Sequence, residues 1–189
     1  MRVTTLLFSI GLMLFIFGSA LGQGIYVDHV DGLNGEGKID DGTTLTFHMR
    51  ITGDATAHFM LNNGFIISSP DVTWNDVTGE YNPSYPWYSW FDFIKVINYW
   101  KTGSVDDTLG IGLLSLMGTG LPALFDDIGF TLTVGPVTGP GGSFLTLDSS
   151  WYPPSNPWMW DIVGEAVAWG GPYAYEMQDV GPAPPVITS

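Results

Sequence analysis

The chain has 189 residues, and its 19 Asp and Glu residues outnumber 5 Lys and Arg, which gives a formal net charge of −14 at pH 7. This charge argues against nucleic acid as a partner, because phosphate contacts need clustered Lys and Arg. No cysteine is present, so no disulfide can stabilise the fold, whereas a hydrophobic fraction of 45% and an aromatic fraction of 14% predict a packed core.

The first 22 residues have the pattern of a cleaved secretory signal peptide. Arg2 precedes an apolar run over residues 6–17, and cleavage is expected near Ala20 or Gly22. The twelve residues of this run are too few to cross a hydrocarbon core, which needs about 20. We therefore expect a secreted protein, extracellular or at the cell surface, without a membrane span.

Residues 23–180 predict one domain built from short strands. The clearest is the segment TTLTFHMRIT, in which apolar and polar residues alternate strictly, as in a half-buried antiparallel strand. In chain order, the expected strands are Ile25–Val30, Thr43–Thr52, His58–Leu61, Phe65–Ser68, Trp90–Asn98, Thr108–Leu116, Ile128–Val134, Ser143–Leu147 and Tyr173–Met177.

Turn-forming sequences separate these strands, among them DGLNGEG, NNG, SSPD, YNPSYP, GTGLP and GPVTGPGG. About nine strands without a convincing amphipathic helix predict an all-β fold, a single antiparallel β-sandwich with long loops rich in aromatic residues, proline and glycine. The segment Trp90–Trp100 also fits a short helix, but its β-branched and aromatic residues favour a strand.

Residues 181–189 form a proline-rich tail that ends in a short strand-like tip, Val186-Ile187-Thr188. Such a terminus is usually frayed. It can also add to the edge of a neighbouring sheet, where Val186 and Ile187 would contact the partner.

The loop from Asp31 to Asp40 is similar to an EF-hand or dockerin calcium loop, because acidic and amide residues alternate before a glycine and an aliphatic residue. Gly32 stands where the first ligand belongs and Thr43 where the final bidentate acid belongs, so a polar turn with solvated acids is the alternative. We expect no cofactor, with calcium as the one alternative, for which the candidate ligands are Asp31, Asn34, Glu36 and Asp40.

Three acidic pairs, at residues 40–41, 106–107 and 126–127, invite comparison with a glycosidase. Neighbours on a strand point to opposite faces, so no adjacent pair makes a catalytic dyad. Motifs such as G-x-S-x-G and H-E-x-x-H are missing from the sequence. We predict that the protein is not an enzyme, with glycoside hydrolysis as the minor alternative.

The histidines, His29, His48 and His58, all fall in expected strands. His29 and His58 could approach one another across a sheet and bind a metal ion. Isolated histidines on strands are more often ordinary surface or core residues.

Two aromatic groups are the strongest candidates for a contact surface. Exposed rings can stack on the apolar face of a sugar or bury at a subunit contact, whereas buried rings would cover the open ends of the sandwich. The candidate residues are Trp87, Tyr88 and Trp90 in the first group and Trp151, Tyr152, Trp158 and Trp160 in the second.

The chain resembles a group of secreted β-sandwich modules from uncultured environmental bacteria. The resemblance is carried by VDGLNGEG, SSPDVTW, DDTLGIG, DSSWYPP and WGGPYAY and covers most of the chain after the leader. It implies a fold and a compartment rather than a reaction. Such modules often belong to surface proteins with a dockerin-like or sorting region, whereas this sequence has only the proline-rich tail after the sandwich.

These features favour an extracellular structural protein that assembles with copies of itself into a homo-oligomer, a helical filament or a surface layer. A terminal segment, Gln23–Val30 or Pro184–Ser189, would add to the neighbour's sheet edge while aromatic loops bury at the contact. A secreted carbohydrate-binding module with glycans as partners is the alternative.

Overall fold

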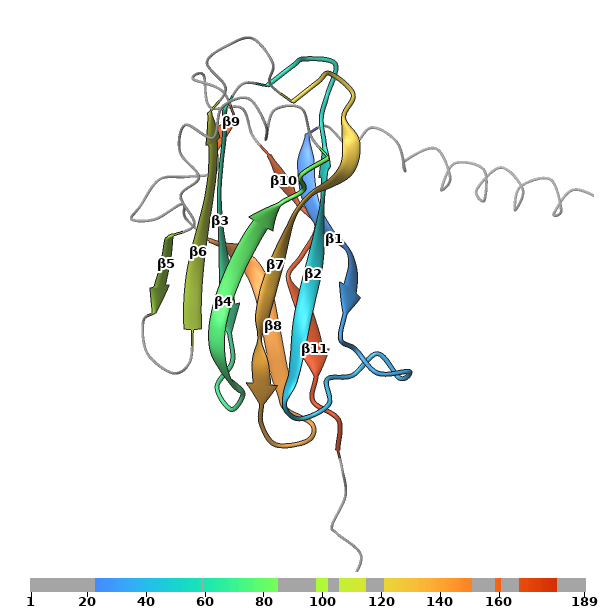
Figure 1. Cartoon of the computed structure of the whole chain (residues 1–189), viewed down its shortest axis with the longest axis vertical. Coiled ribbons are helices and arrows are strands. Elements are labelled where there is room, and N and C mark those ends of the chain that lie inside the picture. The colour runs from blue at the N-terminus through green and yellow to red at the C-terminus, as the bar shows by residue number, and fades with distance from the viewer. Residues whose placement is uncertain are drawn as a thin grey trace, which may run out of the picture.

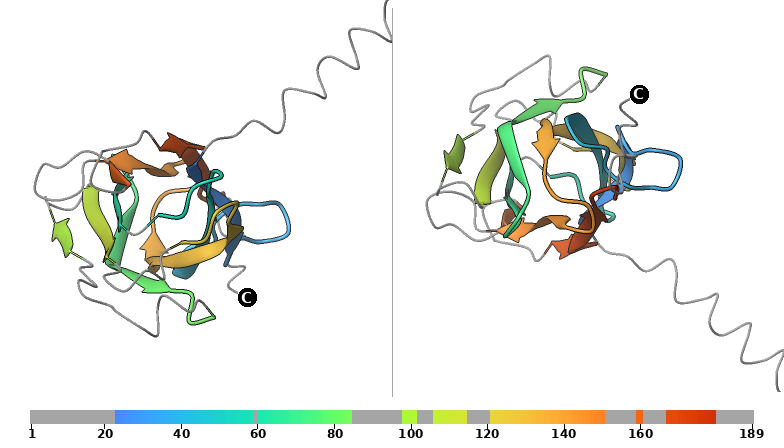
Figure 2. Two further views of the ribbon diagram at one scale, coloured as in Figure 1. Left: turned by 90° about the horizontal axis from the view of Figure 1, so that it is seen from above. Right: turned by 90° about the horizontal axis from the view of Figure 1, so that it is seen from below.

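The computed structural model describes residues 23–58, 60–84, 98–101, 106–114, 121–150, 159–160 and 167–179. All eleven elements within these ranges are strands, and they form two sheets that pack face to face as a β-sandwich (Figures 1 and 2). The all-β sandwich expected from the sequence is confirmed. In the described ranges, no helix has the length and apolar character needed to cross a bilayer.

The first sheet has the strand order β10-β1-β2-β7-β4, and the second has the order β11-β8-β3-β6-β5, with β9 also paired to β3. Neighbouring strands are antiparallel except for β1 and β10. The first sheet contains β1 (Gly24–Asp31), β2 (Thr43–Thr52), β4 (Thr73–Tyr81), β7 (Asp126–Thr138) and β10 (Ala168–Trp169). The second contains β3 (Met60–Ser68), β5 (Asn98–Lys101), β6 (Asp106–Leu114), β8 (Phe144–Ser150), β9 (Met159–Trp160) and β11 (Tyr173–Glu176).

The core lies between the sheets and is built from every second residue of the facing strands. In β2, the strand that the sequence predicted with these same bounds, the apolar residues are buried and the intervening polar residues face outward. Phe65 of β3 connects the two sheets, since its ring lies 5.7 Å from that of Phe130 in β7 and 5.5 Å from that of Trp169 in β10.

The sequence Asn62-Asn63-Gly64 was expected to be a turn, and this prediction is wrong. These residues lie inside β3, which joins the expected strands His58–Leu61 and Phe65–Ser68 into one element starting at Met60. Asn63 pairs with Ile111 of β6 and is only 2% exposed. Pairing in the middle of a sheet has overridden the local turn preference of Asn and Gly.

Strand β4 was not expected, because its sequence TWNDVTGEY is mostly polar and contains a glycine. Its buried residues are Trp74, Val77, Gly79 and Tyr81, so the alternation begins only after an irregular first half. The expected strand Trp90–Asn98 lies outside the described residues except for Asn98, where β5 begins. The assignments of residues 1–22 to a signal peptide and of residues 181–189 to a tail also lie outside them and stay predictions.

Tyr175 of β11 provides a pH test of the packing between the sheets. Its half-buried ring packs edge-on against Phe47 at 5.5 Å, and burial raises the pKa of Tyr175 from 10.0 to about 12. A raised pKa means that the folded state holds the phenol proton more tightly than the unfolded state. We expect this stabilisation to be complete below pH 10, to be lost between pH 10 and pH 12, and to stay absent above that.

Tyr175→Phe should remove this part of the pH dependence of the free energy of unfolding, a difference of about 1–2 kcal/mol after solvent screening. Urea titrations of both proteins at pH 9 and pH 12 measure it. Parallel losses of stability in the two proteins would contradict this explanation.

Candidate functional site

The outer face of β1 and β2 carries a cluster of ionisable side chains that the two strands bring together. Val27 pairs with Met49, but the next pair is His29 with His48, so Asp28 is an extra residue that forms a β-bulge. Because of this bulge, Asp28 and His29, although adjacent in the chain, both reach outer-face side chains of β2.

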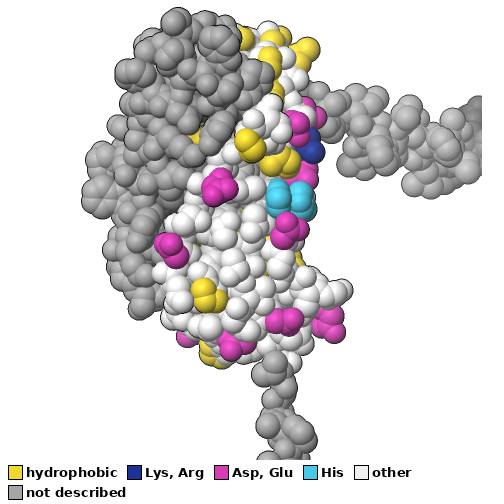
Figure 3. All heavy atoms as spheres, in the orientation of Figure 1, with side chains coloured by type: hydrophobic (Ala, Val, Ile, Leu, Met, Phe, Trp, Pro, Cys, Tyr) yellow, Lys and Arg dark blue, Asp and Glu magenta, His cyan; other side chains and the backbone are white. Residues whose placement is uncertain are grey.

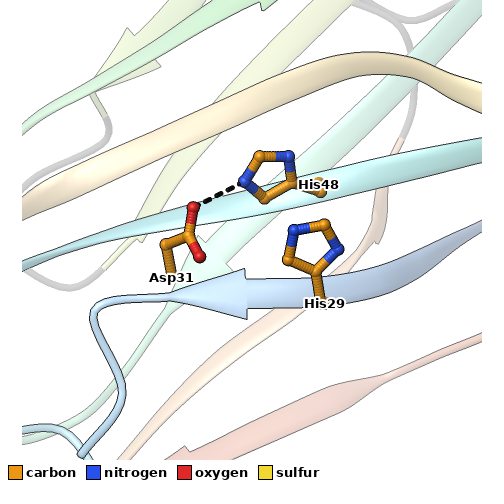
Figure 4. Close-up of side chains that lie close together, drawn as sticks. All are labelled: His29, Asp31 and His48. Atoms are coloured by element: carbon orange, nitrogen blue, oxygen red, sulfur yellow. Dashed lines mark hydrogen bonds and ion pairs between the residues drawn. The ribbon is translucent and has the colours of Figure 1, made fainter.

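The centre of the cluster is formed by His29, His48 and Asp31 (Figure 4). The two imidazole rings are stacked, with centroids 3.9 Å apart and planes inclined by 12°. His48 Nε2 lies 2.8 Å from Asp31 Oδ2, and His29 Nδ1 lies 2.9 Å from Asp28 Oδ2. Each imidazole therefore contacts a different carboxylate of β1.

Arg50 connects this centre to β7. Its Nε donates to Asp28 Oδ1 at 2.6 Å, and its Nη1 donates to Asp126 Oδ1 at 3.1 Å. Hydrogen bonds from His29 and from Arg50 hold the pKa of Asp28 below its ordinary value, while the hydrogen bonds to both carboxylates raise the pKa of Arg50. Asp28 is thus an ionised acceptor that fixes the positions of both His29 and Arg50.

A cavity of about 270 Å³ lies at the β1–β10 end of this face. Trp169 and Tyr173 line it and contact one another edge-to-face, with ring centroids 5.4 Å apart, and Tyr26 and Gly24 contribute to its wall. Both aromatic side chains are anchored, because Trp169 Nε1 donates to Asp148 Oδ1 at 2.8 Å and the Tyr173 hydroxyl accepts from the Val27 amide at 3.2 Å. The result is a small aromatic cavity with fixed walls.

A second hollow, of about 380 Å³, lies on the other side of the histidine cluster. It runs across β7 from His48 to the end of β4, where Glu80 and Asn82 supply polar groups. In the space-filling view, the histidine side chains lie at the surface with acidic side chains near them (Figure 3). This face of the first sheet can therefore offer imidazole, carboxylate and amide groups to a ligand.

The four residues expected to bind calcium do not all direct their side chains to one point. Asn34 Oδ1 accepts the backbone N–H groups of Glu36 and Lys38, at 2.9 and 3.1 Å, and Asn34 Nδ2 donates to Asp40 Oδ1 at 2.8 Å. Asp31 instead turns to His48. The loop is thus held by its own Asn34 as an Asx turn, and calcium binding there stays a prediction.

The sequence left open an approach of His29 to His58, but His29 stacks on His48 instead. His58 is fully buried at a bridge to Leu121, and its Nε2 lies 3.3 Å from Asp54 Oδ1. The alternation in β2 places His48 and Arg50 on one face, which was visible in the sequence. The pairing with His29 depends on strand register and on the bulge, neither of which the sequence pattern reveals.

Most of the expected aromatic and tail contacts fall outside the part of the chain that the structure describes. Trp160 belongs to β9, whose backbone pairs with β3 at Leu61. The residues outside the described ranges are Trp87, Tyr88, Trp90, Trp151, Tyr152, Trp158, Val186 and Ile187. Their role as contact residues stays a prediction.

No protein-family model matches this chain, and no curated protein matches it. The fold is similar to that of cohesins. The solution structure of CaCohA2 from Clostridium acetobutylicum is 13% identical, with 83% of this chain and 92% of that chain covered and a TM-score of 0.49. The sixth cohesin of scaffoldin B from Acetivibrio cellulolyticus, solved in complex with a Cel5 dockerin, is 11% identical, with 84% and 99% covered and a TM-score of 0.46.

The seventh ScaB type I cohesin from Pseudobacteroides cellulosolvens is 11% identical, with 86% of this chain and 95% of that chain covered and a TM-score of 0.41. At 11–13% identity, the likeness to these three proteins is one of fold. The resemblance to secreted bacterial modules noted in the sequence stays a prediction about family.

Proposed function

We propose that this protein is a non-catalytic, extracellular structural module that associates with copies of itself by adding a strand to the outer edge of β4. The observation that supports the proposal is the position of β4 at the end of the strand order of the first sheet. Strand β4 has nine residues and, among the described strands, pairs only with β7. An edge strand of this length offers a row of backbone donors and acceptors to an incoming strand.

The direction of the backbone groups in β4 supports this use of the edge. The Asn82 amide donates to Gly129 O at 3.0 Å, on the β7 side, whereas the Val77 amide is bonded at 2.9 Å to the carboxylate of its own neighbour, Asp76. Successive residues of a strand turn their backbone groups to alternate sides. In the regular second half of β4, Val77 and Gly79 therefore direct their N–H and C=O groups away from β7.

Asp76 restricts which strands can add to this edge. By accepting the Val77 amide, its carboxylate occupies one outward donor, and its charge opposes the approach of another acidic strand. A strand that adds here should therefore be uncharged or basic. Residues 184–189 of a neighbouring copy, PPVITS, carry no charged side chain and meet this requirement.

The other donor expected from the sequence, Gln23–Val30, fits this role less well than the tail. Residues 24–30 belong to β1, which pairs with β2 along its length and with β10 at Gly24 and Ile25. This segment is already an internal strand of its own sheet, so it would have to leave that sheet before it could pair elsewhere.

Removal of residues 181–189 tests the tail as the donor. We expect residues 23–189 to associate with rising concentration, and the truncated protein 23–180 to remain monomeric, as measured by multi-angle light scattering. Equal association of the two proteins would exclude the tail. The truncation lies outside every described strand, so the unfolding transition serves as the control for an intact sandwich.

A carbohydrate-binding module is the second candidate, and the aromatic cavity beside Trp169 favours it. Fixed aromatic walls with nearby hydroxyl and carboxylate groups suit a sugar ring, which has both apolar and hydroxylated surfaces. The cavity is small, so it would take one sugar unit rather than a long chain.

Tyr26→Ala tests this second candidate, because Tyr26 lines the cavity and is only partly buried. If sugar binds there, oligosaccharide titration should change the tryptophan fluorescence, and Tyr26→Ala should weaken the affinity by about tenfold. Phe144→Ala, at an exposed aromatic residue on β8 away from the cavity lining, is the control. An unchanged spectrum across a panel of soluble glycans would remove this candidate.

A further inference from the structure

The cluster on the outer face of β1 and β2 has the composition and spacing of a metal site. One side-chain atom from each of His29, Asp31 and His48 can be chosen so that all three lie within 4.8 Å of one another. Two of these residues come from β1 and one from β2, and the backbones of the two strands pair at this point. We propose that these three side chains bind a transition-metal ion of the zinc class.

The distances fit coordination by a small ion. Two ligands that each lie about 2.1 Å from zinc are about 3.4 Å apart at a tetrahedral angle. His48 Nε2 and Asp31 Oδ2 are 2.8 Å apart, so a small outward movement of the Asp31 carboxylate brings both into this range. The Asp31 side chain is 68% exposed, which allows that movement.

His29 has the supporting contact that a ligating histidine usually has. Its Nδ1 lies 2.9 Å from Asp28 Oδ2, and Asp28 is itself held by Arg50 Nε at 2.6 Å. When Nδ1 carries the proton and donates a hydrogen bond to Asp28, the free lone pair of the ring is on Nε2, which can then bind a metal ion. The bulge at Asp28 therefore places a carboxylate where it can orient His29 as a metal ligand.

One ring must turn for both imidazoles to bind the same ion. A metal lies in the plane of the ring that ligates it, whereas the rings of His29 and His48 are stacked with nearly parallel planes. The side chain of His29 is 51% exposed, so its ring can rotate about the Cβ–Cγ bond without disturbing the core. Rotation brings the in-plane lone pair of Nε2 toward the ion held by His48 and Asp31. The same rotation moves Nδ1, so the Asp28 carboxylate has to follow it for the supporting contact to persist.

The ligand types select the metal. Two imidazoles and one carboxylate suit Zn²⁺, Co²⁺ or Ni²⁺, whereas Ca²⁺ and Mg²⁺ prefer sites made only of oxygen atoms. The net charge of −14 attracts cations, and the charge of Arg50 is offset locally by Asp28 and Asp126. The site is distinct from the loop expected to bind calcium, with which it shares only Asp31.

Isothermal titration of residues 23–189 with Zn²⁺ tests the proposal, and the visible absorption of bound Co²⁺ gives a second readout. We expect saturable binding of one ion per chain. His29→Gln and His48→Gln should each weaken the affinity at least about tenfold, and Asp28→Asn, which removes only the supporting contact, by about tenfold.

Glu36→Gln is the matched control. It removes one exposed acid from the neighbouring loop and leaves the cluster intact, so the affinity for Zn²⁺ should not change. Absence of saturable binding of both Zn²⁺ and Co²⁺ would overturn the proposal. Binding that survives the double substitution His29→Gln and His48→Gln would overturn it as well.

Discussion

Phe65→Ala is expected to lower the free energy of unfolding by about 3–5 kcal/mol, the usual range for a buried phenylalanine in a core that cannot collapse around the cavity. Phe65 is fully buried and extends from β3 in the second sheet to Phe130 in the first. It also contacts Trp169, so its removal loosens the contact of β10 with the core. In a domain without disulfides, whose total stability is about 5–15 kcal/mol, this is a large fraction.

Phe144→Ala provides the comparison, since the same chemical change is made at a residue that is 50% exposed at the start of β8. Its effect should stay within about 0.5 kcal/mol. Urea unfolding followed by circular dichroism measures both variants. Similar losses from the two substitutions would mean that Phe65 does not connect the sheets as described.

Asn75→Pro is expected to weaken self-association by at least about tenfold while leaving the sandwich folded. Asn75 is exposed and is the one residue of β4 without a register partner in β7, so proline there removes no pair of that ladder. The substitution removes one backbone donor from the edge strand and places a ring on the strand that an incoming segment would contact. Asn75→Ala keeps the amide and should associate as the unmodified protein does.

Asp76→Ala should act in the opposite direction. It frees the outward amide of Val77 and removes a negative charge from the edge, so association should become tighter. Sedimentation velocity over a concentration series measures all three variants. If Asn75→Pro and Asn75→Ala behave alike, the added strand does not pair with β4.

The sequence predicted correctly those strands in which one face is buried in the core and the other faces solvent. In β2 the alternation is uninterrupted, and the observed strand has the predicted bounds. The prediction from sequence fails at Asn62-Asn63-Gly64, where burial inside the second sheet outweighs the turn preference of these residues. It also fails in β4, because this edge strand contains polar residues and a glycine.

The candidate site could be predicted only in part. The pattern of β2 already placed His48 and Arg50 on one face, but the strand that supplies their partners could not be read from it. A one-residue bulge at Asp28 decides that His29 meets His48 and that Asp28 reaches Arg50. Register and bulges depend on contacts between distant segments, so local patterns do not reveal them.

Electron microscopy of residues 23–189 over a concentration series tests whether this sandwich is a structural module that adds a strand from a neighbouring copy at β4. We expect regular, elongated assemblies that grow with concentration and that disappear in Asn75→Pro but not in Asn75→Ala. Separate, uniform single-domain particles at every concentration would contradict it.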